Sequence, residues 1–411
     1  MNYCKSMICI QGEIMKITDI EVITFKTTTI HRRSRWGFLL WDEEPINTQQ
    51  SITKISTDEG VCGYMIGGDS IITETRIKPL LVGEDPLQRE KLWTWMNQMV
   101  IQSPELGLNE DIMGIVDCAL WDLFGRMIGQ PVYKILGGVR DRVKAYASSE
   151  PDLGPPEIYA EHVMACKKRG YKAYKVHAYT AFDPHKWQAA PQHPGFPKEE
   201  IEVCKAVREA AGDDMVLMFD PFGVYTLEQS LWVARELEKL NYYWLEHPML
   251  ETRIEAYRRL TAETKIAILA PEHLPGGVYA KAEWLLQRAS NMLRIDHFQG
   301  GITACHKLVT IADAYGIQCE MHGGGWASSQ ILGSTNESTC EYYERGLLPL
   351  DPDFINKPEP YLKSICDPMD DEGNVILPQG PGLGMEFDWD YINDNLLKSD
   401  GTSSNSWVTA Y

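Results

Sequence analysis

Three short apolar runs decide the fold, and each ends at or near an acidic residue: MVLMFD at 215–220, YYWLEHP at 242–248 and IAILAPEH at 266–273. The acids Asp220, Glu246 and Glu272 follow one another at intervals of 26 residues. One strand, one helix and two loops take about that many residues in a βα barrel. Three successive strands of a parallel barrel would therefore each place one carboxylate at the C-terminal rim, where barrel enzymes carry their active sites.

These three acids are interpreted as ligands of one metal ion. Carboxylate oxygens are hard, anionic ligands, and neither cysteine nor histidine belongs to the set. Such a set suits Mg²⁺ better than Zn²⁺. Ordinary surface roles explain single strand-end acids well, but they do not explain three acids at equal spacing.

The alternation of predicted strands and helices continues on both sides of this segment. Five further apolar runs are predicted as strands: VKAYASS at 143–149, KAYKVHAY at 172–179, MLRIDHF at 292–298, IQCEMH at 317–322 and TCEYYE at 339–344. Amphipathic stretches between the strands, such as PKEEIEVCKAVREAAG at 197–212, are predicted helices. Repeated βα units with buried strands predict an α/β fold, and eight such strands close into a TIM-type barrel.

The parts of the chain that flank the barrel have a different pattern. Residues 15–66 contain two β-rich runs, the second with a turn at Asp58-Glu59-Gly60. Residues 86–137 have apolar side chains at helical spacing. The tail from 367 is rich in proline and glycine and then polar, and we expect it to return over the N-terminal part.

Bulk composition excludes several classes of protein. The 411 residues carry a formal net charge of −19, which argues against binding to nucleic acid or anionic membranes, since both require a basic face. The ten cysteines form no C-x-x-C pair, and most lie in apolar runs, which indicates a reducing cytosol. The sequence has no signal-peptide core and no run of about 18 apolar residues. We therefore expect a cytoplasmic protein without a membrane partner.

The second predicted strand carries two candidate catalytic residues. Lys175 and His177 are two positions apart, so both side chains can face the barrel interior. Burying a lysine is costly, so a lysine on a barrel strand favours a functional role. His177 alone could be an interior histidine, but its place beside Lys175 favours catalysis.

The last three strands add further candidates. Asp296 and His322 end neighbouring strands, so Asp296 can hold the His322 imidazole in one tautomer and raise its basicity. Glu341 is the candidate on the last strand, although Glu344 lies in the same stretch. Capping of the following helix is the alternative role for Asp296.

Together these residues resemble the enolase superfamily and, within it, the mandelate racemase subgroup. The resemblance rests on the spaced acids, the K-x-H strand, the distal Asp and His, and the segment DCALWDLFGRMIGQPVYKILGG at 117–138. It covers nearly the whole chain from Met15. The resemblance implies a modified (β/α)7β barrel and an α+β capping domain formed by the N-terminal part and the C-terminal tail. It also implies a Mg²⁺ held by Asp220, Glu246 and Glu272.

On this basis the chain divides into four segments. They are an N-terminal extension (1–14), the capping domain (15–140), the barrel (141–366) and a C-terminal segment that packs back on the capping domain (367–411).

Two loops are expected at the barrel mouth. The resemblance places HRRSRW at 31–36 in the loop that covers the mouth, so His31, Arg33 and Trp36 are candidate substrate contacts, with a solvated basic run as the alternative. The unusually long connection after the second strand adds His185 to this group. Loops of this length are usually functional or disordered, and the aromatic residues Phe182, Trp187 and Phe196 favour an ordered, lid-like loop.

Two positions depart from the family pattern. The second strand often reads K-x-K in this family, whereas His177 takes the place of the second lysine here. The third strand often reads D-x-N, whereas Asp220 is followed by Pro221-Phe222, so a polar contact near the metal is expected to be missing. Both departures bear on which reaction the protein catalyses.

The resemblance implies abstraction of the proton α to a carboxylate. Mg²⁺, Lys175 and, if protonated, Glu341 would stabilise the enediolate that forms. Loss of a β-hydroxyl then gives a 2-keto-3-deoxy acid, whereas reprotonation on the other face gives racemisation or epimerisation. The polar loop around Arg33 suits a polyhydroxy acid, so an acid-sugar dehydratase is favoured.

Two alternatives stay open. One is an isomerase, namely a racemase, epimerase or cycloisomerase, which uses the same intermediate. The other is a binding protein that has lost turnover, although every chemical position is filled by a suitable group. In each enzymatic case we expect a small-molecule carboxylate substrate and a homo-oligomer, since relatives are commonly oligomeric.

Overall fold

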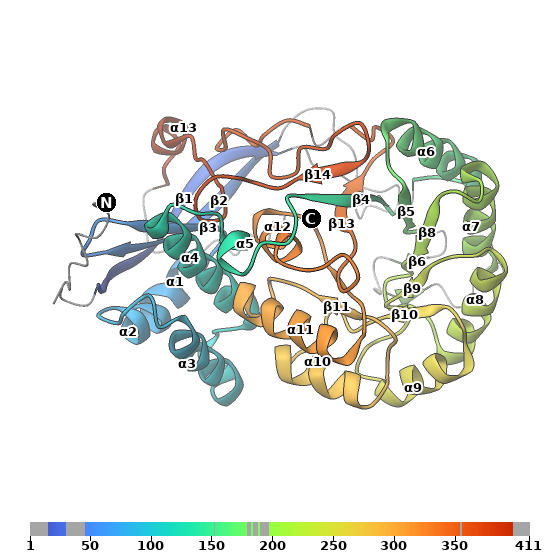
Figure 1. The fold of residues 1–411 in the computed structure, drawn as a ribbon, viewed down its shortest axis with the longest axis horizontal. Helices are drawn as coiled ribbons and strands as arrows, with labels where there is room; N and C mark the ends of the chain where they lie inside the picture. The colour runs from blue at the N-terminus through green and yellow to red at the C-terminus, as the bar shows by residue number, and fades with distance from the viewer. Residues whose placement is uncertain are drawn as a thin grey trace, which may run out of the picture.

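The structure is a computed structural model, and it describes residues 15–29, 46–151, 153–178, 182–183, 188–189, 197–353 and 356–397. Figure 1 shows two parts side by side. The N-terminal residues form an antiparallel sheet with helices, and the central residues form a barrel of strands inside an arc of helices.

The N-terminal sheet has the strand order β1-β2-β3 and is antiparallel throughout. Its strands are β1 (Ile17–Thr29), β2 (Ile46–Thr57) and β3 (Cys62–Ile66). Apolar residues alternate along the strands, and Ile20 pairs with Ile55 on the fully buried face. The predicted turn at 58–60 lies between β2 and β3, where Gly60 has a φ of 75°.

Helix α4 (Glu110–Ile128) joins this sheet to the barrel and is buried along most of its length. Asn109 caps its first turn, and Gly129 ends it with a φ of 68°. The Asp117 carboxylate accepts hydrogen bonds from the backbone and hydroxyl of Thr303. Because Thr303 lies on the barrel helix α11 (Gly301–Tyr315), this contact fixes α4 against the barrel.

The remaining N-terminal helices extend the same layer. They are α1 (Ser70–Ile72), the π-helix η1 (Thr73–Ile77), α2 (Lys78–Leu81), α3 (Arg89–Gln102), the 3-10 helix η2 (Pro104–Leu106) and α5 (Val132–Ile135). The sequence predicted helices from 86 to 137, so the three short elements between 70 and 81 were missed.

Eight parallel strands form the barrel in the described part of the chain, and seven helices connect them. The strands are β4 (Arg142–Ser149), β5 (Ala173–Val176), β8 (Val216–Phe219), β9 (Trp244–Glu246), β10 (Ala267–Leu269), β11 (Leu293–Ile295), β12 (Cys319–Met321) and β13 (Tyr343–Leu348). The helices are α6 (Pro156–Arg169), α7 (Lys198–Ala211), α8 (Leu227–Lys239), α9 (Ile254–Glu263), α10 (Gly277–Leu286), α11 (Gly301–Tyr315) and α12 (Trp326–Gly333).

The order of pairing closes these strands into one barrel. The path β10-β9-β8-β5-β4-β13 is continuous, and β13 pairs in parallel with β4. A parallel bridge between Leu269 and Met292 joins β10 to the β11-β12 pair. The Cys319 amide of β12 donates to the Thr339 carbonyl oxygen, shortly before β13, at 2.7 Å. The modified (β/α)7β barrel expected from the sequence is confirmed.

The barrel interior has an apolar layer below its C-terminal rim. We call it the aromatic layer, and it consists of Tyr146, Ala173, Met218, Trp244, Leu269, Met292 and Tyr342. Tyr146 and Trp244 meet edge to face, with ring centroids 5.7 Å apart. This layer fills the barrel from below, so groups nearer the strand ends form a site that opens at one rim.

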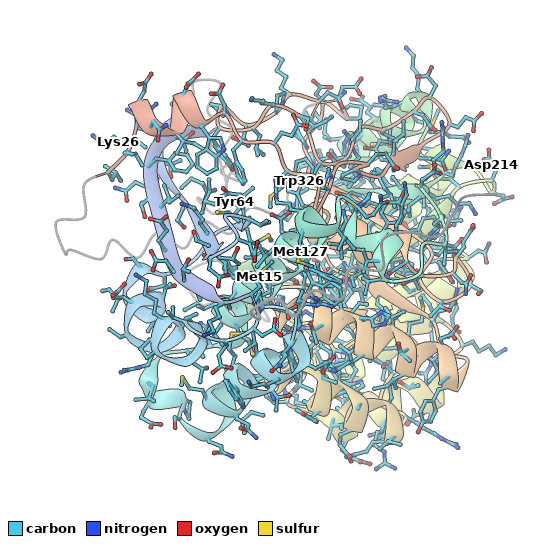
Figure 2. All side chains as sticks on the ribbon, turned by 60° about the vertical axis from the view of Figure 1, so that its left-hand side comes forward. Met15, Lys26, Tyr64, Met127, Asp214 and Trp326 are labelled. Atoms are coloured by element: carbon cyan, nitrogen blue, oxygen red, sulfur yellow. The ribbon has the colours of Figure 1, made fainter. Side chains whose placement is uncertain are left out.

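The described C-terminal residues contact both parts of the molecule. Strand β14 (Asn374–Ile376) pairs antiparallel with β4, and the Leu397 amide donates to the Thr24 carbonyl oxygen of β1. Helix α13 (Trp389–Asp394) lies over β1, and Trp389 packs against Tyr64, which Figure 2 labels. The segment therefore ties the antiparallel sheet to the barrel.

Parts of two expected features lie outside the described residues. These are the extension at 1–14 and most of the long connection after β5, in which only β6 (Phe182–Asp183) and β7 (Gln188–Ala189) are described. Within the described ranges, no helix combines the length and apolar character needed to cross a membrane.

Candidate metal centre and active site

For five of the seven members of the aromatic layer, the residue two positions further along the same strand is charged. Side chains two apart on a strand face the same way, so these residues stack above the aromatic layer. We call this set the charged layer, and each member is 5% exposed or less: Lys175, Asp220, Glu246, Arg294 and Glu344.

The structure brings Asp220, Glu246 and Glu272 together. One carboxylate oxygen from each lies within 4.8 Å of the other two, and all three residues are buried. Neither oxygen of Glu272 accepts a hydrogen bond of good geometry from the described residues. Close, buried carboxylates need cations around them, and hard oxygens in this arrangement fit Mg²⁺. These three residues would hold the ion.

Lys175 lies among the carboxylates of the charged layer. Its Nζ is 2.8 Å from Glu344 Oε1, 3.1 Å from both oxygens of Glu246 and 3.7 Å from Asp220 Oδ2. Burial would lower the pKa of Lys175, but Glu246 and Glu344 raise it above its ordinary value. The side chain is therefore a fixed cation next to the acidic triad.

His177 lies on the Asp220 side of the triad. Its Nε2 is 3.1 Å from Asp220 Oδ2, and its Nδ1 is 2.8 Å from the Ser149 carbonyl oxygen. Because a carbonyl oxygen can only accept, Nδ1 carries a proton and donates it. Nε2 is thus the nitrogen that faces the acidic triad.

His322 lies on the Glu272 side of the triad and is paired with Asp296. Its Nδ1 is 2.6 Å from Asp296 Oδ2, and its Nε2 is 2.9 Å from Glu272 Oε1. Burial would lower the pKa of His322, but Glu272 and Asp296 raise it to about 10. Burial would raise the pKa of Asp296, but the hydrogen bond from His322 brings it to about 2. The structure therefore pairs these two residues as the sequence predicted.

Arg294 belongs to the site although the sequence analysis did not select it. Its Nε is 2.8 Å from Glu246 Oε1, and its Nη2 donates to Glu344 and to the Tyr146 hydroxyl. The side chain is fully buried. Its position two residues before Asp296 on one strand was the signal that could have identified it.

The structure corrects the prediction for Glu341. Glu341 precedes β13 at the N-terminal end of the barrel, where its Oε1 lies 3.8 Å from the exposed Lys144. Glu344 takes the position in the site, and it accepts from Lys175 and from the Gly323 amide at 2.7 Å. Side chains two positions apart on a strand face the same way. Glu344 stands two positions after Tyr342 of the aromatic layer and so faces the barrel interior, whereas Glu341 directly precedes Tyr342.

Glu344 also differs from Glu341 in its expected chemistry. Burial would raise the pKa of Glu344, but Lys175 and Arg294 hold it well below its ordinary value. The group is therefore a carboxylate that accepts hydrogen bonds, and it does not act as the protonated donor that the sequence analysis considered for Glu341.

Two further histidines surround Glu272 and were also missed. His247 Nδ1 lies 3.4 Å from Glu272 Oε2, and His273 Nε2 lies 3.1 Å from Glu272 Oε1. Each directly follows a triad acid in the sequence, which was the available signal. Alternation would turn such a neighbour away from the site, but His247 has a φ of 39° and so leaves the strand conformation.

Four predicted substrate contacts lie outside the described residues: His31, Arg33, Trp36 and His185. Their roles stay predictions.

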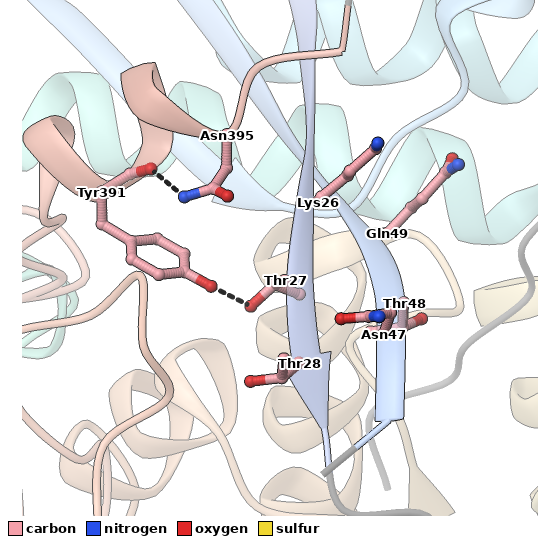
Figure 3. Close-up of a pocket in the computed structure, with 8 residues that line it drawn as sticks. All are labelled: Lys26, Thr27, Thr28, Asn47, Thr48, Gln49, Tyr391 and Asn395. Carbon is pink, nitrogen blue, oxygen red and sulfur yellow. Dashed lines mark hydrogen bonds between the residues drawn. The ribbon is translucent and has the colours of Figure 1, made fainter.

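A separate pocket opens between β1, β2 and α13, away from the charged layer (Figure 3). Its volume is about 360 Å³, and its described lining is polar: Lys26, Thr27, Thr28, Asn47, Thr48, Gln49, Tyr391 and Asn395. The Tyr391 hydroxyl lies 3.2 Å from Thr27 Oγ1 across it. This lining contains neither a carboxylate nor an imidazole, so we assign it no part in the chemistry.

Comparison with known proteins matches both parts of the chain to family models. The model for the mandelate racemase / muconate lactonizing enzyme N-terminal domain matches residues 45–137, and the enolase C-terminal domain-like model matches residues 158–391. The chain belongs to the mandelate racemase / muconate lactonizing enzyme family of the enolase superfamily.

Similar members of the family include dehydratases and a cycloisomerase. The crystal structure of D-glucarate dehydratase from Agrobacterium tumefaciens complexed with magnesium shares 35% identity and a TM-score of 0.84, and the match covers 94% of this chain and 100% of that one. D-galactonate dehydratase from Cronobacter sakazakii is 30% identical over 92% of this chain and 94% of its own. D-galactarolactone cycloisomerase from Agrobacterium fabrum is 26% identical over 76% and 81%.

One departure from the family pattern has a structural explanation. Where the family often has D-x-N, this chain has Asp220-Pro221-Phe222, and the Phe222 backbone amide donates to Asp220 Oδ1 at 2.8 Å. A main-chain group therefore makes a polar contact with the first acid of the triad. The Phe222 side chain is apolar, so no polar side chain from this position reaches the triad.

The two glutamates near β13 give a matched pair of variants. Glu344→Gln is expected to lower kcat/KM by about 10- to 100-fold, the usual cost of removing a group that orients active-site residues, because Glu344 holds Lys175 and Arg294 in place. Glu341→Gln at the other end of the barrel should leave kcat/KM unchanged. Steady-state kinetics on one accepted substrate checks this, and equal effects of the two substitutions would contradict the assignment.

Proposed function

We propose that this protein is a Mg²⁺-dependent dehydratase that converts a sugar acid to a 2-keto-3-deoxy acid. The observation that carries the proposal is the placement of two histidines about the acidic triad. His177 lies 3.1 Å from Asp220, and His322 lies 2.9 Å from Glu272. A substrate bound at the triad would therefore have one imidazole on each flank.

The charged groups suit a reaction in which negative charge builds on a carboxylate. When bound, Mg²⁺ supplies Lewis-acid stabilisation of that charge. Lys175 would add a fixed positive charge that is held in place by Glu246 and Glu344 before the substrate arrives. Preorganised charge of this kind is usually the largest single contribution to catalysis.

The histidines would carry the two proton transfers. One takes the proton from the carbon next to the carboxylate, and the electron pair of that bond forms the C2–C3 double bond. The bond from C3 to its hydroxyl breaks, and the oxygen leaves as water with a proton from the other histidine. The enol product then takes a solvent proton at C3 and becomes the 2-keto acid.

Asp296 would act on His322 as a positioning residue. Its Oδ2 lies 2.6 Å from Nδ1, and this contact directs Nε2 toward Glu272 and the substrate side. The Phe298 amide donates to the other oxygen, Oδ1, at 2.8 Å, so the carboxylate is itself fixed. The imidazole thus has one defined orientation.

The named relatives support a sugar-acid substrate. D-glucarate dehydratase and D-galactonate dehydratase each match more than nine-tenths of this chain. Both act on hydroxylated acids by name, and Mg²⁺ on the acidic triad with Lys175 beside it would suit the carboxylate of such an acid. We therefore propose a mono- or diacid sugar as substrate.

A screen of mono- and diacid sugars tests this directly. With Mg²⁺ present, at least one acid should give a 2-keto product that reacts with semicarbazide, and excess EDTA should remove the signal because the triad then lacks its ion. The Asp220→Asn variant serves as the matched control. A library in which no acid yields a keto product, while the protein is folded and Mg²⁺-loaded, would contradict the proposal.

An isomerase is the second candidate, and the same geometry favours it. Histidines on both flanks also permit removal of a proton from one face and its return on the other. One relative, D-galactarolactone cycloisomerase, is an isomerase by name. A product with the same mass as its substrate would favour this reading.

Three predictions from the sequence stay predictions. They are the residue boundaries of the domains, a cytoplasmic location and assembly as a homo-oligomer.

A further inference from the structure

We infer that His247, His273 and Glu272 form a second metal site, rich in nitrogen ligands, that takes a borderline transition-metal dication such as Zn²⁺. This goes beyond the proposed function, which needs only a hard ion on the acidic triad. It rests on the positions of the side chains and does not depend on which substrate the protein accepts.

The ligand atoms of this second site have suitable spacing. Glu272 Oε2 lies 3.4 Å from His247 Nδ1, and Glu272 Oε1 lies 3.1 Å from His273 Nε2. Ligands of a tetrahedral Zn²⁺ at bond lengths of about 2.0–2.2 Å are separated by roughly 3.3 Å. One atom from each of the three residues lies within 4.8 Å of the others.

His247 supplies an independent sign of a missing ligand. Its side chain is buried, with the residue 6% exposed, yet Nδ1, which lies 3.4 Å from Glu272 Oε2, makes no hydrogen bond of good geometry with the described residues. Buried polar atoms normally have a partner. The nitrogen is directed at Glu272, so an ion between them would satisfy both groups.

The His247 ring is held in this position by its surroundings. The residue has a φ of 39°, a backbone region that few residues other than glycine adopt, although Asn, Asp and His adopt it more often than the rest. The Gly223 amide donates to the His247 carbonyl oxygen, and a Cβ at Gly223 would lie 2.8 Å from the ring Nε2. The chain therefore accepts an unfavourable backbone conformation and a glycine to keep the ring facing Glu272.

The other two ligands are also fixed, and one is accessible. Glu251 accepts from the backbone amides of Glu272 and His273, so it holds the loop that carries both. The His273 side chain is 43% exposed, so an ion can enter from the solvent. Imidazole nitrogen suits Zn²⁺ and its neighbours better than Mg²⁺, so the two sites would select different ions.

Optical titration with Co²⁺ tests the proposal, because Co²⁺ with nitrogen ligands at four-coordinate sites absorbs visible light strongly and Co²⁺ in six oxygens does so weakly. The protein is first stripped with EDTA, and Asp220→Asn is used as the background so that the triad is disabled. Binding is read from the spectrum, so the result is independent of any turnover and of whether the proposed function is correct.

Ligand variants then show which residues bind the probe. Asparagine tolerates the positive φ at position 247, so His247→Asn should fold. His273→Asn changes a partly exposed side chain and should also fold. Weaker Co²⁺ binding in both variants would therefore not be explained by unfolding of one of them. Each should weaken Co²⁺ binding by at least about 10-fold. His306→Asn on helix α11, outside the cluster, is the matched control and should bind as the background does.

The outcome decides the proposal in either direction. A strong visible spectrum in the background and in His306→Asn, lost in His247→Asn and in His273→Asn, supports a nitrogen-rich site. The same spectrum in all four proteins, or only the weak spectrum of oxygen-bound Co²⁺, would overturn it and would assign the two histidines to ion pairing with Glu272 alone.

Discussion

Glu246→Gln is expected to lower kcat by about 1,000-fold, the upper end of what loss of one preorganised charge-stabilising group costs. Glu246 is the middle acid of the triad and is fully buried. Its two oxygens face Lys175 and Arg294, and the Trp244 indole donates to Oε2 at 3.0 Å. Removing the negative charge would weaken the metal site and leave two buried cations less well neutralised.

The Glu246→Gln result needs a test that separates catalysis from folding. The amide keeps an oxygen that can accept from Trp244, so circular dichroism should show a folded protein. Glu255→Gln on helix α9, an exposed glutamate, is the matched control and should keep full activity. Isothermal titration should show that Mg²⁺ binding is lost in the first variant and retained in the second. Full turnover of the parent protein in excess EDTA would contradict the metal assignment.

Replacement of either flanking histidine is expected to lower turnover by about 100- to 10,000-fold, the usual contribution of a general acid or base. The two substitutions, His177→Asn and His322→Asn, should differ in proton exchange. The histidine that removes the α proton is needed for exchange of that proton with deuterium oxide. The histidine that assists departure of the hydroxyl is needed for product formation and not for exchange.

Exchange followed by NMR therefore assigns the two roles. One variant should lose both exchange and turnover, and the other should lose turnover while it keeps exchange. His306→Asn, far from the triad in sequence and on the outer helix α11, should behave as the parent does. If both active-site variants keep parental exchange and turnover on the accepted substrate, the two-histidine account is wrong.

The sequence predicted the barrel because the signals involved are local. Each strand is a short apolar run, and each interval between the triad acids matches one βα unit. The Lys175–His177 spacing and the Asp296–His322 pairing follow from alternation on strands and from the adjacency of successive strands. Every member of the charged layer stands two positions after a member of the aromatic layer on the same strand.

The same two-residue spacing identifies the two residues that the sequence predictions did not include, Arg294 and Glu344. Arg294 stands two positions after Met292, and Glu344 stands two positions after Tyr342. Selecting Glu341 required knowledge of where β13 begins, and strand boundaries are the least certain part of a sequence-based prediction.

His247 was beyond reach for another reason. Its ring faces Glu272 only because the backbone leaves the strand conformation at a φ of 39°. Alternation predicts the opposite orientation for a residue that directly follows Glu246. Such a departure is set by tertiary contacts, here with Gly223, which lies far from His247 in the sequence.

Dehydration is tested most directly by the mass of the product from a single turnover with Mg²⁺ on an acid that the screen identifies. We expect a product that is lighter than the substrate by one molecule of water. In deuterium oxide the product should also carry one deuterium at C3, because the enol takes its proton there from the solvent. A product of unchanged mass from every accepted acid would contradict dehydration and would assign the site to an isomerase.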